Sequence, residues 1–235
     1  MSNELIEQGK RAAAIQAVEN HIEPGMVIGI GSGSTVVHVV KQLAALNQTK
    51  DLALKCVPTS YQTEDLIIEH GLRLASLDEF PTIDIAIDGA DEIDQHLNAI
   101  KGGGGCLVRE KIVAASANKF ILVVDYRKHS QALGEKWKKG VPIEIIPFAR
   151  SPLIERLRGL GGKPTLRQAQ VKMGPLVTDN GNFIIDVDFG IINNPSELHQ
   201  SLLALPGVVD VGLFIGMASA AYIGQQDGTI LVLCK

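Results

Sequence analysis

The sequence predicts an α/β fold in which a doubly wound, mostly parallel sheet is joined to a smaller α+β domain. Short apolar stretches alternate with helical patterns in the first half of the chain, as they do in βαβ units. After Asp125 the pattern changes to a polar, lysine-rich segment, followed by strands and a tight-turn signal at Asn180-Gly181. We therefore expect an α/β domain over 1–133 and 207–235, and a lid over 134–206.

In the first half, every expected strand is short and mostly apolar. An amphipathic helix opens the chain, and helices are expected at 35–46, 61–71 and 106–117. The expected strands are MVIGI (26–30), LALKCV (52–57), TIDIAI (82–87) and FILVVD (120–125). Because a helix connects each strand to the next, neighbouring strands are expected to run parallel.

The second half predicts a strand at 141–147, a helix at 151–160 and a hairpin at 178–189 around Asn180-Gly181. Pro195 begins a further helix, which Pro206-Gly207 ends. The stretches VVDVGLF (208–214) and TILVL (229–233) are expected to be strands that rejoin the first sheet. No internal repeat is visible, so repeat architectures are set aside.

Composition indicates an ordinary soluble protein. The chain has 235 residues, 46% of them hydrophobic, and a net charge of −4, which favours neither nucleic acid nor an anionic membrane as a partner. Cys56, Cys106 and Cys234 contain no CxxC pair, so a disulfide framework or a structural zinc site is not expected. No run of residues has the length of a membrane span. We expect a cytoplasmic protein.

The segment 88–110 carries the residues most suited to chemistry. Asp88 and Asp91 follow a predicted buried strand, at the sheet edge where ligands bind in open α/β folds. Crowded carboxylates repel one another, so at least one is expected to hold its proton tightly, as acid–base catalysis requires. Divalent-metal binding is the alternative, although the EF-hand pattern is absent. Glu92 and Asp94 are expected to lie in a solvated loop.

The turn GIGSGST, residues 29–35, lies between a predicted strand and a predicted helix. Its amide groups and hydroxyls are suited to binding an anion at a helix start, and the alternative is a tight turn capped by Ser34. Ser34 stands where a dinucleotide fingerprint needs glycine, and Gly33 stands where a P-loop needs lysine. The turn is therefore a candidate phosphate site of another kind.

Lys101 precedes four glycines, Gly102 to Gly105, which have no side chain to pack and which leave backbone amides accessible. A cation beside such amides predicts an anion-stabilising site, whereas a solvated lysine is the alternative. Glu110 shares a helix face with the apolar Val113 and Ala114. Partial burial there would raise its pKa, as a general base needs. A surface ion pair is the other reading of Glu110.

A phosphate turn, an acid pair, a lysine and one carboxylate base are suited to moving a proton between adjacent carbons of a sugar phosphate. The motifs GSGST, DGADEID, KGGGG and REK resemble those of the A-type ribose-5-phosphate isomerase family. VPIEIIPFAR, GGKPTLRQ, VTDNGN and LPGVVDVGLF resemble the second domain and carboxyl end of the same family. The resemblance thus covers nearly the whole chain.

The resemblance implies a Rossmann-like α/β/α domain with a ferredoxin-like lid. It implies an isomerase of the non-oxidative pentose phosphate pathway that interconverts D-ribose 5-phosphate and D-ribulose 5-phosphate through a cis-enediolate. No metal or cofactor takes part in the family's reaction, and homodimers or homotetramers are usual.

The resemblance also implies roles for single residues. Glu110 corresponds to the base, Asp88 to a group that assists ring opening, and Lys101 to the group that stabilises the enediolate oxygen. Asp91 corresponds to a residue that holds hydroxyls. The substrate-binding positions implied are Ser32, Gly33, Ser34, Thr35, Asp88, Gly89, Ala90, Asp91, Lys101, Gly102, Gly103, Gly104 and Lys128.

Two other functions stay open from the sequence. An amino-sugar-phosphate deaminase of related fold would need a catalytic histidine relay, and none of the six histidines is convincingly placed. A non-enzymatic sugar-phosphate sensor would keep the phosphate turn and lose the base, whereas Glu110 is present.

Overall fold

The computed structural model describes residues 3–235, which form two compact units. The first unit holds the chain up to Ala90, Arg109–His129 and Met217–Lys235, and the second holds Asp91–Val108 and Ser130–Gly216. The second unit therefore includes 91–108, which the expected domain limits assign to the α/β domain. The expected limits stay a prediction: an α/β domain over 1–133 and 207–235, and a lid over 134–206. Within residues 3–235, no helix is both long and apolar enough to cross a membrane.

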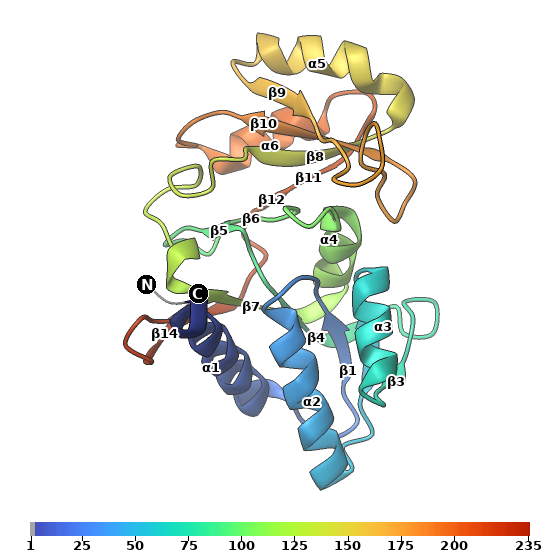
Figure 1. Cartoon of the computed structure of the whole chain (residues 1–235), viewed down its shortest axis with the longest axis vertical. Helices are drawn as coiled ribbons and strands as arrows, with labels where there is room; N and C mark the ends of the chain where they lie inside the picture. Colours follow the sequence, from blue (N-terminus) through green and yellow to red (C-terminus); the bar gives the residue numbers. More distant parts are fainter. Residues whose placement is uncertain (1–2) are drawn as a thin grey trace. The chain divides into compact units, whose positions relative to one another are not determined.

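The first unit is built on a seven-stranded sheet with the strand order β14-β13-β7-β4-β1-β2-β3 (Figure 1). All neighbouring strands run parallel except β13 and β14, which confirms the predicted mostly parallel sheet. The strands are β1 (Val27–Ile30), β2 (Lys55–Pro58), β3 (Arg73–Leu74), β4 (Ile83–Asp88), β7 (Ala117–Asp125), β13 (Ala220–Gly224) and β14 (Ile230–Cys234). The chain moves from β1 outward to β2 and β3, then returns to the other side of β1 as β4. The switch point, where α/β folds bind ligands, thus lies between β1 and β4.

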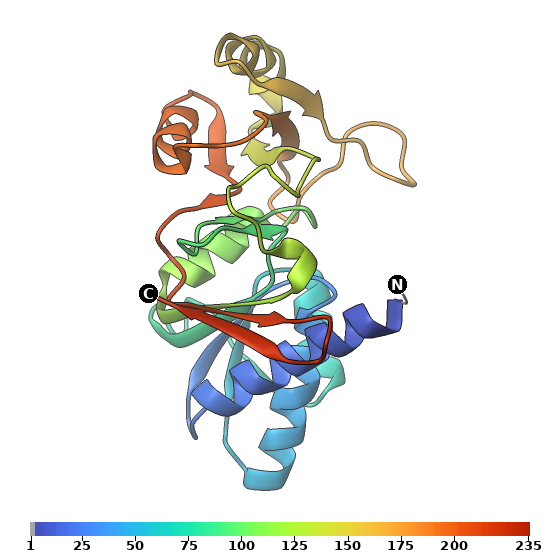
Figure 2. The same ribbon diagram turned by 90° about the vertical axis from the view of Figure 1, so that its left-hand side faces the viewer.

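Helices cover both faces of this sheet. They are α1 (Asn3–His21), α2 (Val36–Lys50), α3 (Tyr61–Glu69), α4 (Leu107–Ala115) and the short η1 (Tyr126–Lys128). The side chains of Ile28 and Ile85 join the buried cluster formed with Ala13 of α1 and Val39 of α2. Helix α1 packs along β13 and β7 (Figure 2). A Cβ on Gly29 would point to the opposite face of the sheet, where it would meet Val113 of α4. This arrangement confirms the doubly wound fold.

The second unit contains a four-stranded antiparallel sheet in the order β11-β8-β10-β9. Its elements follow the chain order strand, helix, strand, strand, helix, strand, which with this strand order is the ferredoxin-like arrangement. They are β8 (Val141–Ile145), η2 (Pro147–Ala149), α5 (Arg150–Gly159), β9 (Lys163–Leu166), β10 (Phe183–Asp188), α6 (Pro195–Leu203) and β11 (Val208–Val211). A separate three-stranded sheet holds β5 (Glu92–Ile93), β6 (Ala99–Ile100) and β12 (Leu213–Phe214).

Two expectations for the second half are wrong in part. The stretch 208–214 does not rejoin the first sheet, because β11 pairs with β8 and β12 with β6, whereas β13 and β14 do rejoin it. The turn at Asn180-Gly181 is present, with Gly181 at φ +80. The segment before it is not a strand, however, since Thr178 and Asn182 are tied by side-chain hydrogen bonds to Glu144 of β8. β10 pairs instead with β8 and β9.

Candidate functional site

Asp88 ends β4 at the switch point of the first unit, next to the turn that follows β1. Its Oδ1 accepts hydrogen bonds from Ser32 N at 3.2 Å and Gly89 N at 2.7 Å. A Cβ on Gly31 would lie 1.8 Å from the same oxygen, so only glycine at 31 leaves room for the carboxylate. Asp88 is 2% exposed. The structure thus brings the predicted acid and the predicted phosphate turn together.

Hydroxyl groups from the β2–α3 connection and the first turn of α3 fix that turn. Ser32 Oγ lies 2.8 Å from Thr59 Oγ1 and 2.7 Å from Ser60 Oγ. Thr63 Oγ1 donates to the carbonyl of Gly31 at 2.6 Å, and Gly33 N donates to the Gln62 side chain at 3.0 Å. No sequence motif identified these residues as partners of the turn. The turn is therefore held in place by the residues around the start of α3.

The expected alternative for the turn, a helix cap by Ser34, is not observed. Helix α2 begins at Val36, and its N-cap residue Thr35 makes no side-chain capping bond. Ser34 Oγ instead accepts a hydrogen bond from Lys10 Nζ of α1 at 3.0 Å. Lys10 also contacts Glu7 at 2.7 Å, and the hydrogen bonds from Lys10 and His38 lower the pKa of Glu7. Lys10 thus brings a cation to the turn that sequence reasoning missed.

Glu110 lies in the first turn of α4 and is 6% exposed, so the predicted burial is present. One helical turn later, Val113 packs on the sheet so closely that a Cβ on Gly29 would lie 2.3 Å from its Cγ1. Helix α4 connects parallel strands β4 and β7, so its amino end lies at the same sheet edge as Asp88 and the turn. The neighbouring Arg109 stacks its guanidinium over the Tyr61 ring at 5.0 Å.

Lys128 lies in η1, directly after β7, and is half-buried. Asp125 precedes it and binds Arg127 through both carboxylate oxygens at 2.7 and 3.0 Å. Burial disfavours the charged form of Asp125, but the hydrogen bonds and charge of Arg127 outweigh it and lower the pKa of Asp125. The pair fixes the start of η1 at the carboxyl end of β7, where Lys128 was predicted.

The other predicted residues belong to the second unit. Lys101 is 2% exposed, its backbone N donates to Gly212 O at 2.9 Å, and its ammonium lies 5.4 Å from the centre of the Phe214 ring. The alternative of a solvated surface lysine is therefore wrong. Asp91 Oδ2 accepts a hydrogen bond from Gly103 N at 2.7 Å, so this carboxylate holds the glycine run that follows Lys101.

Glu92 and Asp94 are not in a solvated loop, contrary to expectation. Glu92 is 0% exposed and accepts hydrogen bonds from the amides of Gly134 and Lys136, both at 2.6 Å. Asp94 is 5% exposed and accepts from the amides of His96 and Asn98, both at 2.9 Å. Both buried carboxylates are thus satisfied by backbone donors of neighbouring loops.

Within residues 3–235, no three His, Cys, Asp or Glu side chains are grouped so that they could hold a metal ion.

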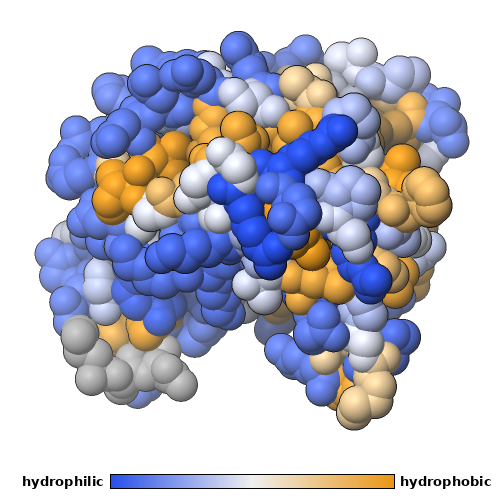
Figure 3. All heavy atoms as spheres, turned by 90° about the horizontal axis from the view of Figure 1, so that it is seen from above, coloured by the Kyte–Doolittle hydropathy of each residue, from blue (hydrophilic) through white to orange (hydrophobic). Residues whose placement is uncertain are grey.

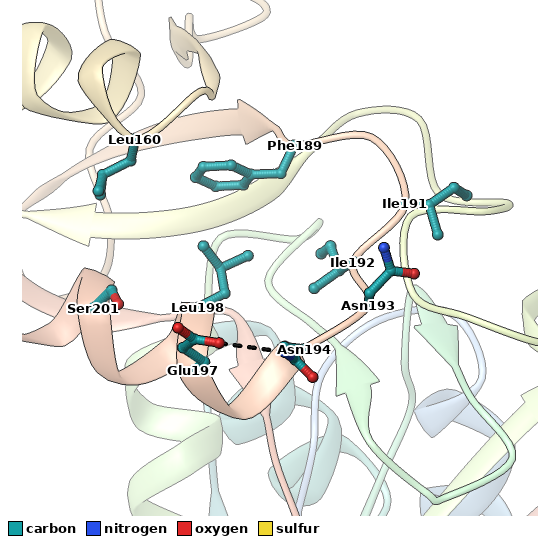
Figure 4. A pocket seen from close by; sticks show the side chains of 9 residues that line it. All are labelled: Leu160, Phe189, Ile191, Ile192, Asn193, Asn194, Glu197, Leu198 and Ser201. Atoms are coloured by element: carbon teal, nitrogen blue, oxygen red, sulfur yellow. Dashed lines mark hydrogen bonds between the residues drawn. The ribbon is translucent and has the colours of Figure 1, made fainter.

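A cavity of about 310 Å³ lies in the second unit beside the loop between β10 and α6. Its lining side chains include Leu160, Phe189 and Leu198, and Asn194 donates to Glu197 at its edge (Figure 4). None of the predicted site residues lines it. Hydrophobic side chains reach the surface between hydrophilic ones on the face shown in Figure 3. Phe148 and Val171 are among the exposed large hydrophobic residues of the chain.

Comparison with known proteins decides the family. Residues 55–228 match the family model of ribose 5-phosphate isomerase A, phosphoriboisomerase A. The chain belongs to the ribose-5-phosphate isomerase A family. The ribose-5-phosphate isomerase of Sus scrofa is 52% identical over 95% of the chain and 74% of that protein. The Candida albicans enzyme is 50% identical over 100% of the chain and 99% of that protein. A solved D-ribose-5-phosphate isomerase in complex with phospho-erythronic acid is 42% identical and covers 100% of both chains, with a TM-score of 0.94.

The region that matches the family model includes Asp88, Asp91, Lys101, Glu110 and Lys128. Family membership confirms the resemblance drawn from the motifs, and the structural match confirms the predicted fold class.

The three cysteines differ in environment, which gives a simple test of the fold. Cys56 is buried in β2, and burial raises the pKa of its thiol to about 12. Cys106 is partly exposed and Cys234 is exposed. A thiol reagent at pH 8 should therefore label Cys234 and Cys106 in the native protein and Cys56 only after unfolding. Cys106→Ser and Cys234→Ser variants assign the reacting thiols, and native labelling of all three would contradict the burial of β2.

Proposed function

We propose that this chain interconverts D-ribose 5-phosphate and D-ribulose 5-phosphate in the non-oxidative pentose phosphate pathway. Family membership supports the reaction. The structural observation that carries the proposal is the buried carboxylate of Glu110 at the sheet edge that also holds Asp88 and the Gly31–Thr35 turn. A general base beside an anion-binding turn is suited to a phosphorylated sugar.

The reaction moves one proton from carbon 2 of the aldose to carbon 1 of the product. We assign this transfer to Glu110, the buried carboxylate at this sheet edge. Asp88 assists ring opening and proton movement at the sugar oxygens. Ser32, Gly33, Ser34 and Thr35 bind the phosphate, with Lys10 adding positive charge through its contact with Ser34.

Negative charge develops on the substrate oxygens as the enediolate forms. We assign its stabilisation to Lys101 and to those amides of the glycine run Gly102, Gly103 and Gly104 that are not already bound to Asp91. Asp91 holds substrate hydroxyls and also the Gly103 amide, since a carboxylate accepts several hydrogen bonds. Gly89, Ala90 and Lys128 complete the proposed substrate-binding set. The reaction so assigned needs no metal or cofactor, and we propose a cytoplasmic homodimer or homotetramer.

The direct test is conversion of ribose 5-phosphate to ribulose 5-phosphate by the purified protein in buffer with a metal chelator. We expect full turnover, and competitive inhibition by phospho-erythronic acid, whose carboxylate resembles the charge of the enediolate. Activity restored only by a divalent metal would assign Asp88 and Asp91 to metal binding. Binding of the sugar phosphate without turnover under either condition would favour a sensor.

A further inference from the structure

The peptide group between Gly102 and Gly103 is held at both ends by charged side chains of the second unit. Gly102 O accepts a hydrogen bond from Arg167 Nη1 at 2.8 Å, and Gly103 N donates to Asp91 Oδ2 at 2.7 Å. Gly105 N also donates to Gly102 O at 2.9 Å. Because C=O and N–H point in opposite directions in a trans peptide, these contacts fix the orientation of the peptide plane.

Arg167 is itself held by Asp186 of β10. Nε and Nη2 of Arg167 donate to the two carboxylate oxygens of Asp186 at 2.8 and 2.5 Å. The side chains are only 14% and 16% exposed, so water weakens the pair little. This two-point contact uses one edge of the planar guanidinium and leaves Nη1 directed at the loop, where it also lies 3.2 Å from Gly103 O.

The glycine run needs such external contacts. Gly102 has φ +100 and Gly105 has φ +89, a region that residues with a side chain rarely adopt. A Cβ on Gly103 would lie 2.5 Å from Asp91 Oδ1, so the approach of the carboxylate requires glycine there as well. Glycine residues lose more conformational freedom on ordering than any other residue. Contacts from Asp91 and from Arg167, which Asp186 of β10 holds, offset part of that loss.

We propose that Arg167, held by Asp186, is a positioning residue that sets the direction of the Gly103 and Gly104 amides. With the carbonyls of Gly102 and Gly103 turned toward Arg167, the N–H groups of Gly103 and Gly104 point the opposite way. The Gly103 N–H reaches Asp91, and a Cβ on Gly104 would meet nothing within 4 Å. Gly104 is exposed, so its amide, which is turned away from Arg167, is accessible to a ligand.

The effect on catalysis rests on the proposed function, in which amides of this run stabilise the enediolate. A preoriented amide stabilises developing charge without rearrangement during the reaction. Loss of the Arg167 contact should therefore weaken binding of the transition state more than binding of the substrate.

Arg167→Met is expected to lower kcat by about 10-fold or more and to change KM by less than about 3-fold, because misplacement of a stabilising group acts mainly on the transition state. Arg167→Lys keeps the charge but not the planar fork, so it should restore only part of kcat. Lys163→Met is the matched control. Lys163 lies on the same strand pair at 3.9 Å from Asp188 and is 84% exposed.

Removing Arg167 alone leaves Asp186 without its cation, so the double variant Arg167→Met/Asp186→Asn guards against loss of folding. It should keep the thermal midpoint close to that of the wild type and still show the loss of kcat. Wild-type kcat in a folded double variant would overturn the proposal. A rise confined to KM would overturn it as well, because Arg167 would then be a substrate-binding residue.

Hydrogen exchange of the Gly103 amide gives a readout that does not depend on turnover. The amide should exchange slowly in the wild type and in Lys163→Met, and faster in Arg167→Met. The amide could exchange faster in Arg167→Met while the wild-type protein shows no isomerase activity. That result would support the positioning of the loop by Arg167 and refute the proposed function. Unchanged exchange in Arg167→Met would refute the loop contact, whatever the activity.

Discussion

Glu110→Gln is expected to lower kcat by about 100-fold or more, because a general base contributes about 10²- to 10⁴-fold to a rate and glutamine cannot accept the proton. Glutamine has nearly the same shape, so the packing of α4 around this buried side chain should persist. KM should change little if Glu110 acts only in proton transfer. Steady-state kinetics with ribose 5-phosphate measures both constants.

Glu69→Gln is the control for this substitution, since Glu69 is an exposed glutamate of α3 in the same unit. It should leave kcat unchanged. A second measurement separates the chemistry from folding: in D₂O the wild type should introduce deuterium at the carbon that receives the proton, and Glu110→Gln should lose this exchange while still binding phospho-erythronic acid. Near-normal turnover of Glu110→Gln would remove Glu110 as the base.

The architecture could be predicted where the signal is local. The strands around Ile28, Ile85 and Val123 are short, apolar and separated by helices, and these patterns alone indicate a parallel doubly wound sheet. Burial of Glu110 followed in the same way from Val113, three residues later on one helix face. Family motifs added the activity, which no pattern of burial implies.

The errors come from contacts between residues far apart in the chain. Glu92 was expected in solvent, yet its carboxylate accepts a hydrogen bond from the amide of Gly134, which lies 42 positions later. Lys10 reaches Ser34 across 24 positions, and Arg167 reaches Gly102 across 65. From sequence alone, a charged residue is expected to have an exposed side chain. Only the fold shows that a distant backbone group or a second charge can satisfy the same side chain when it is buried.

For a related reason, the sheet that 208–214 joins was predicted wrongly, although the stretch does form strands. VVDVGLF has the composition of a strand, but composition does not state which sheet the strand joins. Gly212 divides the stretch, and a Cβ there would lie 2.2 Å from the Lys101 carbonyl. The close approach of two backbones at this glycine separates β11 from β12 and directs them into two different sheets.

Lys101→Met should lower kcat by about 100-fold, in the range measured when one preoriented group of an oxyanion site is removed. Methionine is similar in size to the aliphatic part of lysine, so the change mainly removes the ammonium and its contact with the Phe214 ring. Lys101 is 2% exposed, so water screens its charge little. A charge in such a place acts strongly on an enediolate oxygen that comes near it.

The ratio of the two kinetic constants decides between transition-state and ground-state binding. If Lys101 stabilises the enediolate, Lys101→Met lowers kcat and leaves KM within about 3-fold, and phospho-erythronic acid loses more affinity than the substrate does. If only KM rises, the ammonium binds the ground state, and the enediolate must be stabilised by the amides of the glycine run alone. In that case Arg167, which orients those amides, becomes the residue on which the rate depends most after Glu110.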